Sequence, residues 1–180
     1  MSPSPDPGDQ LAKKTKLEEK VDQISKIIDE IYVNRSEATF VYELKNATGI
    51  LKSEKKHICD RNFYCRGIEW TLMLDFKANE QTKFLSLYLC TLNGRPSNWQ
   101  IKGSYEIKIL NQLGHEDRVE NGTAIFKSSK FSSDYGWGYP EFVRLTELAD
   151  LSKGLLKNDL IVFEVKLKAD RLVVCDLPMP

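Results

Sequence analysis

The sequence has few of the residues from which enzyme and metal sites are usually built. Its 180 residues include only two histidines, His57 and His115. There is no HExxH motif, no glycine-rich loop that would hold a phosphate, and no zinc-ligand spacing. His57 stands near Cys59 in a charged segment, and no motif places an activated nucleophile beside either histidine. We therefore expect a protein that is not an enzyme, with no catalytic residue, no metal and no cofactor.

An excess of charge and a long apolar run are also missing. Lys and Arg number 26, and so do Asp and Glu, which gives a formal net charge of zero. A neutral chain without a basic run argues against a nucleic-acid partner. No apolar run approaches the ~20 residues that a membrane span needs, so we expect no membrane contact.

The N-terminal MSPSPDPG lacks the charged and apolar parts of a secretory signal. We therefore expect an intracellular, cytoplasmic protein. In such a compartment cysteines stay reduced. The four cysteines have no CxxC spacing, and we expect them to be free thiols, mostly buried: Cys59, Cys65, Cys90 and Cys175.

The chain divides into a tail, a helix and one larger domain. Residues 1–9 are rich in Pro, Ser and Asp, and we expect a disordered tail. Residues 10–35 contain no Gly or Pro and predict an α-helix, for which Asp9 can be the cap. From 37 to 176 the sequence has the short apolar runs and turn residues of a β domain. A hydrophobic content of 41% fits a folded globule.

Within the helix, apolar residues recur at alternating spacings of four and three. They are Leu17, Val21, Ile24, Ile28 and Ile31. This is the pattern of a and d positions in a coiled coil, and Ile at both positions favours three strands over two. Two interpretations remain: a short parallel coiled coil that makes a homo-oligomer, with a trimer favoured, or an amphipathic helix packed back onto its own domain.

The β part predicts several short strands at roughly ten-residue spacing. We expect strands at 39–44, 61–65, 68–76, 83–92, 104–111, 118–127, 159–168 and 172–175, with 118–127 broken at Asn121-Gly122. A loop is expected at 46–56, turns at 93–96 and 113–115, and a helical turn at 145–151. Without long helices between the strands, this pattern indicates an all-β fold, an antiparallel β-sandwich behind one N-terminal helix.

Alternation within two strands shows which side faces the core. In 84–90 the leucines occupy the odd positions, which places Tyr88 on the opposite face. In 161–167 the odd positions are again apolar. Both strands are therefore expected to be half buried, with Tyr88 on the more exposed side.

An aromatic stretch, YGWGYPEF at 135–142, stands apart from the rest. Trp137 and Tyr139 are two residues apart, so in extended backbone they point to the same side. Such rings either close the end of a β core or line a contact surface, and both interpretations stay open. Four serines precede the stretch, at 128, 129, 132 and 133, and either contact a ligand or lie in a solvated loop.

Six segments carry a family resemblance in the family's own order. They are 40–46 (FVYELKN, with Tyr42 where Trp is usual), 67–72 (GIEWTL), 85–89 (LSLYL), 105–111 (YEIKILN), 137–142 (WGYPEF) and 154–159 (GLLKND). Together they resemble the MATH domain, the meprin and TRAF homology module. The resemblance implies an antiparallel sandwich of seven or eight strands.

The resemblance also implies a function, an adaptor that binds short extended peptide motifs in a shallow aromatic groove. The groove positions fall on Tyr88, Tyr105, Trp137 and Tyr139, to which we add Ser129 and Tyr135. A fifth aromatic position falls on Ala124, and a Lys-Asp pair that reads substrate serines falls on Tyr135 and Gly136. These departures argue against a preference for Ser/Thr-rich partners.

A helix that leads into the domain is similar to the arrangement in TRAF signalling adaptors, which trimerise. The family also has members in the ubiquitin pathway. The alternative function is a structural or assembly protein whose aromatic surface binds one fixed partner or its own helix.

Overall fold

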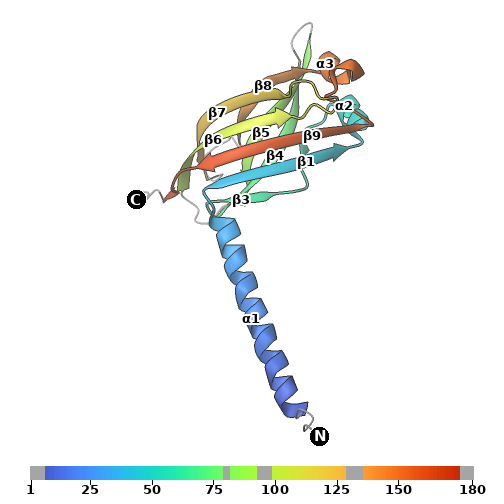
Figure 1. Cartoon of the computed structure of the whole chain (residues 1–180). Helices are drawn as coiled ribbons and strands as arrows, with labels where there is room; N and C mark the ends of the chain where they lie inside the picture. The colour runs from blue at the N-terminus through green and yellow to red at the C-terminus, as the bar shows by residue number, and fades with distance from the viewer. Residues whose placement is uncertain (1–6, 79–81, 93–98, 129–135, 175–180) are drawn as a thin grey trace.

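Figure 1 shows the computed structural model, a β-sandwich from which a long N-terminal helix extends. The structure describes residues 7–78, 82–92, 99–128 and 136–174; the side chains of 7–14, 16 and 17 lie outside the description. The expected turn at 93–96 lies outside the described residues as well. No described helix is long and apolar enough to cross a membrane.

The N-terminal helix is longer than expected. α1 runs from Pro7 to Asn34, so it begins three residues before the predicted start at residue 10. The residues at 7–9 are therefore helical rather than part of a disordered tail. Proline suits the first helical position because its missing N–H would have had no partner there.

Two five-stranded antiparallel sheets form the described part of the domain. In the first, which we call sheet A, the order is β1-β9-β6-β7, and a short β10 also pairs with β6. Its strands are β1 (Glu37–Lys45), β6 (Trp99–Ile109), β7 (Arg118–Lys127), β9 (Leu160–Ala169) and β10 (Val173–Val174).

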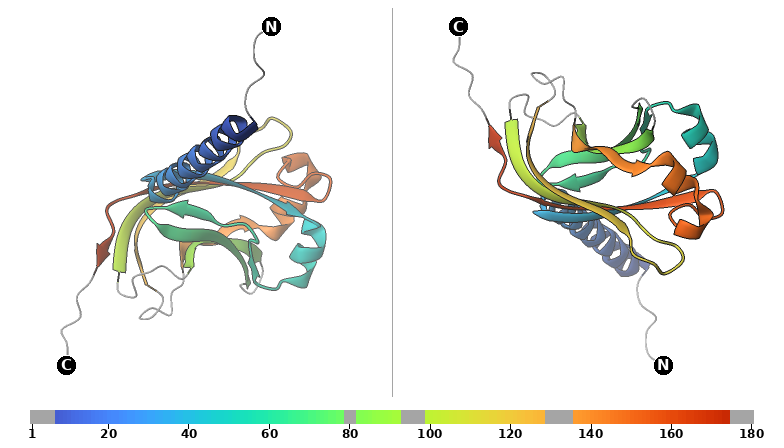
Figure 2. Two further views of the ribbon diagram at one scale, coloured as in Figure 1. Left: turned by 90° about the horizontal axis from the view of Figure 1, so that it is seen from below. Right: turned by 90° about the horizontal axis from the view of Figure 1, so that it is seen from above.

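The second sheet, sheet B, has the order β4-β5-β8, with β2 and β3 both paired to the outer side of β4. Its strands are β2 (His57–Ile58), β3 (Phe63–Cys65), β4 (Ile68–Ala78), β5 (Lys83–Leu92) and β8 (Gly136–Arg144). Figure 2 shows the two curved sheets packed face to face, with the helix beside them. The predicted all-β sandwich is confirmed.

Three local expectations were wrong. Residues 46–56 are not all loop: α2 (Ala47–Ser53) forms there, and Asp159 Oδ1 accepts a hydrogen bond of 2.7 Å from the amide of Thr48 in its first turn. β7 is unbroken, because Gly122 packs over the ring of Tyr105 instead of forming a turn. β6 begins at Trp99, five residues before the predicted start.

The expected helical turn near residue 145 is present as α3 (Leu145–Ala149), followed by a 3-10 turn at Leu151–Lys153.

The core lies between the sheets, and β9 follows the predicted alternation. β5 does not: Ser86 and Cys90 on its other face are also buried, so the expectation of a half-buried strand was wrong there. Leu85, Leu87 and Leu89 are completely buried, and the odd residues of 161–167 are buried from the opposite sheet. Trp70 packs edge-on against Phe126, with 4.7 Å between ring centroids. Burial of each such side chain stabilises the fold by about 1.5–3 kcal/mol. Three cysteines are free and buried as expected, Cys59, Cys65 and Cys90, while Cys175 lies outside the described residues.

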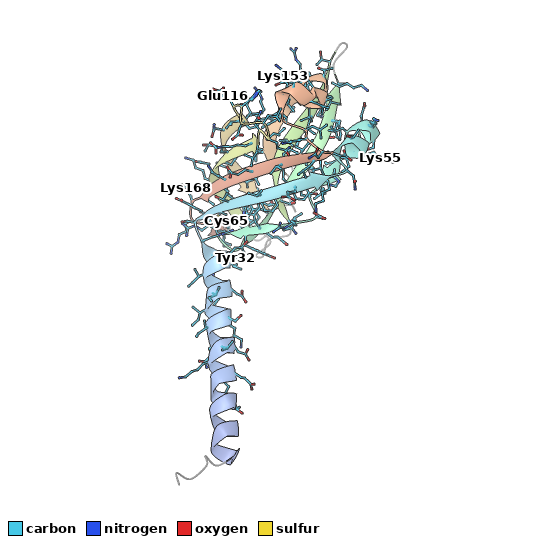
Figure 3. All side chains as sticks on the ribbon, turned by 45° about the vertical axis from the view of Figure 1, so that its right-hand side comes forward. Tyr32, Lys55, Cys65, Glu116, Lys153 and Lys168 are labelled. Carbon is cyan, nitrogen blue, oxygen red and sulfur yellow. The ribbon has the colours of Figure 1, made fainter. Side chains whose placement is uncertain are left out.

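The helix is joined to the domain by main-chain hydrogen bonds at its C-terminal end. Arg66 and Gly67, in the turn between β3 and β4, have positive φ angles of 56° and 72°. Their amides donate to the carbonyls of Arg35 and Val33, each at 2.9 Å. Tyr32 lies at this junction, close under Cys65 in Figure 3. The turn thus satisfies carbonyls that a helix end leaves without partners.

The close approach of β8 to β5 gives a prediction on stability. A Cβ at Gly138 would lie 1.9 Å from the carbonyl oxygen of Leu87, a main-chain atom that cannot move aside. We expect Gly138→Ala to lower the free energy of unfolding by about 3 kcal/mol or more. Gly49 lies in α2, and a methyl group added there would point into open space, so Gly49→Ala should raise the free energy of unfolding by about 0.5–1 kcal/mol. Chemical denaturation of both variants measures the difference, and equal stabilities would contradict the packing described.

Candidate functional site

Two neighbouring strand edges form the candidate site. β8 is the last strand of sheet B and β7 the last strand of sheet A. Side chains bridge them: Trp137 Nε1 donates to the carbonyl of Ile125 at 3.0 Å, and Arg118 Nε donates to the carbonyl of Phe142 at 2.9 Å. The sandwich is therefore held together on this side by side chains, and the strand edges meet without a shared ladder.

The sequence of β8 explains why it lies where it does. Gly136 and Gly138 sit directly on the main chain of β5, where a side chain would collide with Leu89 and Leu87. Pro140 lacks an amide hydrogen, which an edge strand tolerates. The β5–β8 register shifts between Leu85 and Leu87. These residues make β8 a closely packed, irregular edge.

Trp137 and Tyr139 share a side, as the extended pattern predicts. Their cross-strand partners are Leu89 and Leu87, so both point toward the core side of sheet B at its margin. Trp137 is 49% exposed. Tyr139 is half buried, with its ring 6.2 Å from that of Phe142. Trp137 thus belongs to the surface, and Tyr139 joins surface to core.

Tyr105 is a core residue rather than a surface residue. Only 7% of it is exposed, and its ring contacts Phe126 at 6.1 Å and Tyr139 at 6.3 Å between centroids. A Cβ at Gly122 would lie 2.7 Å from its hydroxyl. Tyr105 therefore adds little exposed surface to the aromatic edge, and its ring instead packs against that of Tyr139 from the core side.

Tyr88 lies on the other face of sheet B. Its cross-strand partners are Gly138 on β8 and Met73 on β4. Partners in a ladder share a face, so Tyr88 points away from Trp137 and Tyr139. It is half buried. The structure therefore brings Trp137 and Tyr139 together and leaves Tyr88 on the opposite side of the same edge.

The remaining predicted positions add little to the candidate site. Ser129 and Tyr135 lie outside the described residues. Ala124, at the fifth aromatic position, is 8% exposed and forms part of the core. Sequence reasoning missed Ile125, which is 49% exposed on β7 beside Trp137. The alternation of β7 marks its side chain as outward-facing, but only the contact between the strands shows its neighbour.

The sequence of this domain matches the model of a known protein family. A model of the MATH domain matches residues 39–167. The chain belongs to the MATH domain family. MATH domains are protein-interaction domains, and protein binding is the class of function to which this chain belongs.

Relatives of the chain carry the MATH domain in different settings. Two MATH domain and coiled-coil domain-containing proteins of Arabidopsis thaliana are 29% and 27% identical to it, over 54% and 71% of this chain and 26% and 39% of theirs. Ubiquitin C-terminal hydrolase 12 of the same plant is 26% identical over 68% of this chain and 11% of its own length. The chain thus spans well under half of each relative. The trimeric lipoprotein SadB of Salmonella enterica matches with a TM-score of 0.33 and 11% identity, over 94% of this chain and 79% of that one, which supports no conclusion.

The helix that precedes the MATH domain exposes its apolar seam. Val21, Ile24, Ile28 and Ile31 are 56–66% exposed, and the side chain of Leu17 lies outside the description. Ile27 and Tyr32, which the heptad pattern does not include, add 56% and 45% exposed side chains. α1 meets the domain mainly at β3 and points away from it (Figure 1). The alternative of a helix packed back onto its own domain, or over the aromatic edge, is therefore wrong for this structure.

The charged residues beside the rings are Glu141 and Arg144, both exposed on β8, and one pair on β7. Arg118 and Glu120 form an ion pair at 2.9 Å. Burial, with a smaller effect from the Glu120 carboxylate, raises the pKa of Tyr139. Within the part of the chain that the structure describes, no group of three His, Cys, Asp or Glu residues could hold a metal. The edge therefore offers rings and main-chain groups rather than a charged centre.

The burial of Tyr105 gives a prediction on alkaline stability. Burial raises its pKa to about 12. A tyrosine with a higher pKa in the folded chain stabilises the fold below its unfolded pKa of about 10, and this contribution is lost as the pH rises toward 12. We expect the free energy of unfolding of Tyr105→Phe to fall less steeply than that of the wild type above about pH 10. Denaturant titrations across this range test it, and parallel curves would contradict the assignment.

Proposed function

We propose that the MATH domain captures short extended segments of partner proteins along β8, and that α1 gathers several copies of the domain. One observation carries the first part. β8 is an edge strand that carries the half-exposed ring of Trp137. Within the described residues no backbone–backbone hydrogen bond beyond its pairing with β5 engages it, although the carbonyl of Phe142 already accepts a hydrogen bond from Arg118. An extended peptide adds to such an edge through main-chain hydrogen bonds.

The opposite placement of the aromatic residues supports this mode of binding. Side chains of an added strand alternate between the two faces of the sheet. One set would lie beside Trp137 and Tyr139, and the other set over Gly138 toward Tyr88. The lack of a side chain at Gly138 leaves that second path open. The two faces of the edge would then recognise alternate residues of one peptide.

The size of the exposed rings sets the expected strength of binding. Burial of about 200 Å² of ring surface contributes roughly 5 kcal/mol before the costs of association. One edge should therefore bind a peptide with micromolar or weaker affinity. Several edges on one oligomer can raise the avidity by roughly 10²–10⁴. Weak single sites and a shared helix are thus complementary parts of one mechanism.

Selection from a display library of random twelve-residue peptides tests the aromatic edge. We expect the full chain to enrich a motif with two apolar residues an odd number of positions apart, one for each face. Trp137→Ala combined with Tyr88→Ala should weaken binding of an enriched peptide by roughly 10–100-fold, because the ring surface is lost.

Tyr64→Ala is the matched control, since Tyr64 is a partly exposed tyrosine on β3, at the opposite end of sheet B from β8. It should bind as the wild type does. Unchanged binding by the double variant, at unchanged melting temperature, would refute the β8 site. Enrichment of a single invariant sequence would instead favour an assembly protein with one fixed partner.

Sedimentation of the full chain tests the second part. We expect an oligomer, with a trimer favoured by Ile at both core positions, at concentrations of tens of micromolar. Ile24→Asp with Ile28→Asp should give a monomer, because two carboxylates would enter the apolar seam. Gln23→Asp, outside the seam, should leave the assembly unchanged. A wild-type chain that stays monomeric at these concentrations would exclude the coiled coil.

A further inference from the structure

A second strand edge lies on the side of the sandwich far from β7 and β8, and β3 packs beside part of it. β1 is the other end strand of sheet A, and a cleft of about 720 Å³ runs along it. Seven consecutive residues of β1, 39–45, line the cleft together with the segment 60–63, and Tyr32 and Ile50 mark its ends. The cleft is therefore as long as most of the strand.

The main chain of β1 is available to this cleft. β1 pairs with β9 over its whole length, from Glu37 to Lys45. Within the described residues, no backbone hydrogen bond reaches β1 from its other side. In an antiparallel ladder, successive residues direct their N–H and C=O groups to opposite sides. Alternate residues of β1 thus present donors and acceptors to the cleft, which is the template for an added strand.

The surroundings favour a single peptide over a second copy of the domain. α1 leaves the domain beneath β1 and β3 in Figure 1, on the side where another sheet would have to add. Tyr32 from this helix lines the cleft. The helix therefore obstructs a complete sheet, while a single extended chain fits between Tyr32 and Ile50.

The side chains along the cleft indicate the chemistry of the occupant. Its inner side is aromatic: Phe40 stacks with Phe63 at 5.0 Å between centroids, and the Tyr42 hydroxyl lies 3.4 Å from His57 Nε2. On the outer face, Val41 is 43% exposed. Glu43 and Lys45 follow it on the same face, both exposed, and neither forms an ion pair with a described residue. The edge thus presents an apolar residue, an acid and a base in a row.

We propose that the β1 edge is a second peptide-binding site, for an extended segment that pairs antiparallel with β1. The segment carries an acidic residue opposite Lys45, a basic residue opposite Glu43 and a β-branched apolar residue opposite Val41. Cross-strand pairs of opposite charge and of β-branched residues stabilise a sheet. Antiparallel pairing is also slightly more stable per residue than parallel pairing. This site is separate from β8. It would recognise the order of charged residues in the ligand, whereas β8 would recognise its ligand through aromatic rings.

A charge exchange tests the proposal with the full chain. The probe is the blocked peptide ETKIVTT, whose first, third and fifth residues face Lys45, Glu43 and Val41, and the comparison peptide is KTEIVTT. We expect the wild type to prefer ETKIVTT by roughly tenfold, and the double variant Glu43→Lys with Lys45→Glu to reverse this preference. Fluorescence anisotropy measures both affinities. Hydrogen exchange on the bound wild type should show slower exchange of amides within residues 37–45.

The outcomes separate this site from β8. The double variant keeps the net charge and alters only exposed side chains, so an unchanged melting temperature confirms its fold. Trp137→Ala with Tyr88→Ala should bind ETKIVTT as the wild type does, whether or not β8 binds peptides. No binding of either peptide, a preference that the exchange leaves unchanged, or protection confined to residues 136–144 would each overturn the proposal.

Discussion

Two sheets packed around one core leave strand edges on two sides of the sandwich, and the binding surfaces that we propose for this MATH domain lie along those edges. On one side β7 and β8 are tied by the hydrogen bond from Trp137 to the carbonyl of Ile125. On the other, β1 lies beside the junction with the helix, and its outer main-chain groups stay free of backbone partners among the described residues. Both strands contribute side chains to the core, among them Phe142 of β8 and Leu44 of β1. We propose both edges as binding sites because of their outer main-chain groups.

Trp137 has two physical roles that constrain each other. Its indole N–H links the sheets, while 49% of the residue remains exposed. A partner that covers the ring without displacing it would keep the hydrogen bond to Ile125 and would bury the exposed ring surface. A partner that turns the ring would lose a hydrogen bond worth about 1 kcal/mol. If β8 is the binding edge, recognition there favours ligands that leave the Trp137 ring in its present orientation.

Local patterns predicted what depends on neighbours in the sequence. The heptad spacing predicted α1, and the alternation of leucines at 85, 87 and 89 predicted which face of β5 is directed toward the core. The burial of Tyr105 depends on Gly122, which is 17 positions away and contacts it only after β6 and β7 pair. The opposite directions of Tyr88 and Trp137 likewise depend on the register between β5 and β8. Such contacts between distant segments leave no periodic signal.

The failures have the same origin. Asn121-Gly122 has the composition of a turn, yet the ladder of β7 continues through it because the glycine is needed for packing. The segment after Asn46 resembles a loop in composition, but burial of Ala47 and the carboxylate of Asp159 stabilise a short helix. In both places tertiary contacts outweigh local propensity, which differs between conformations by only about 1 kcal/mol per residue.

The junction between helix and domain determines what an assembly can do. The amides of Arg66 and Gly67 hold the helix end, and Arg35 Nε donates to the carbonyl of Tyr64 at 3.0 Å, so three hydrogen bonds fix the direction in which α1 leaves. A flexible linker would let each domain search for a ligand independently. In the oligomer that we propose, a fixed joint would instead hold the strand edges at set distances and angles. Avidity would then depend on a match between that spacing and the spacing of binding segments in the partner, and the joint would contribute to specificity without touching the ligand.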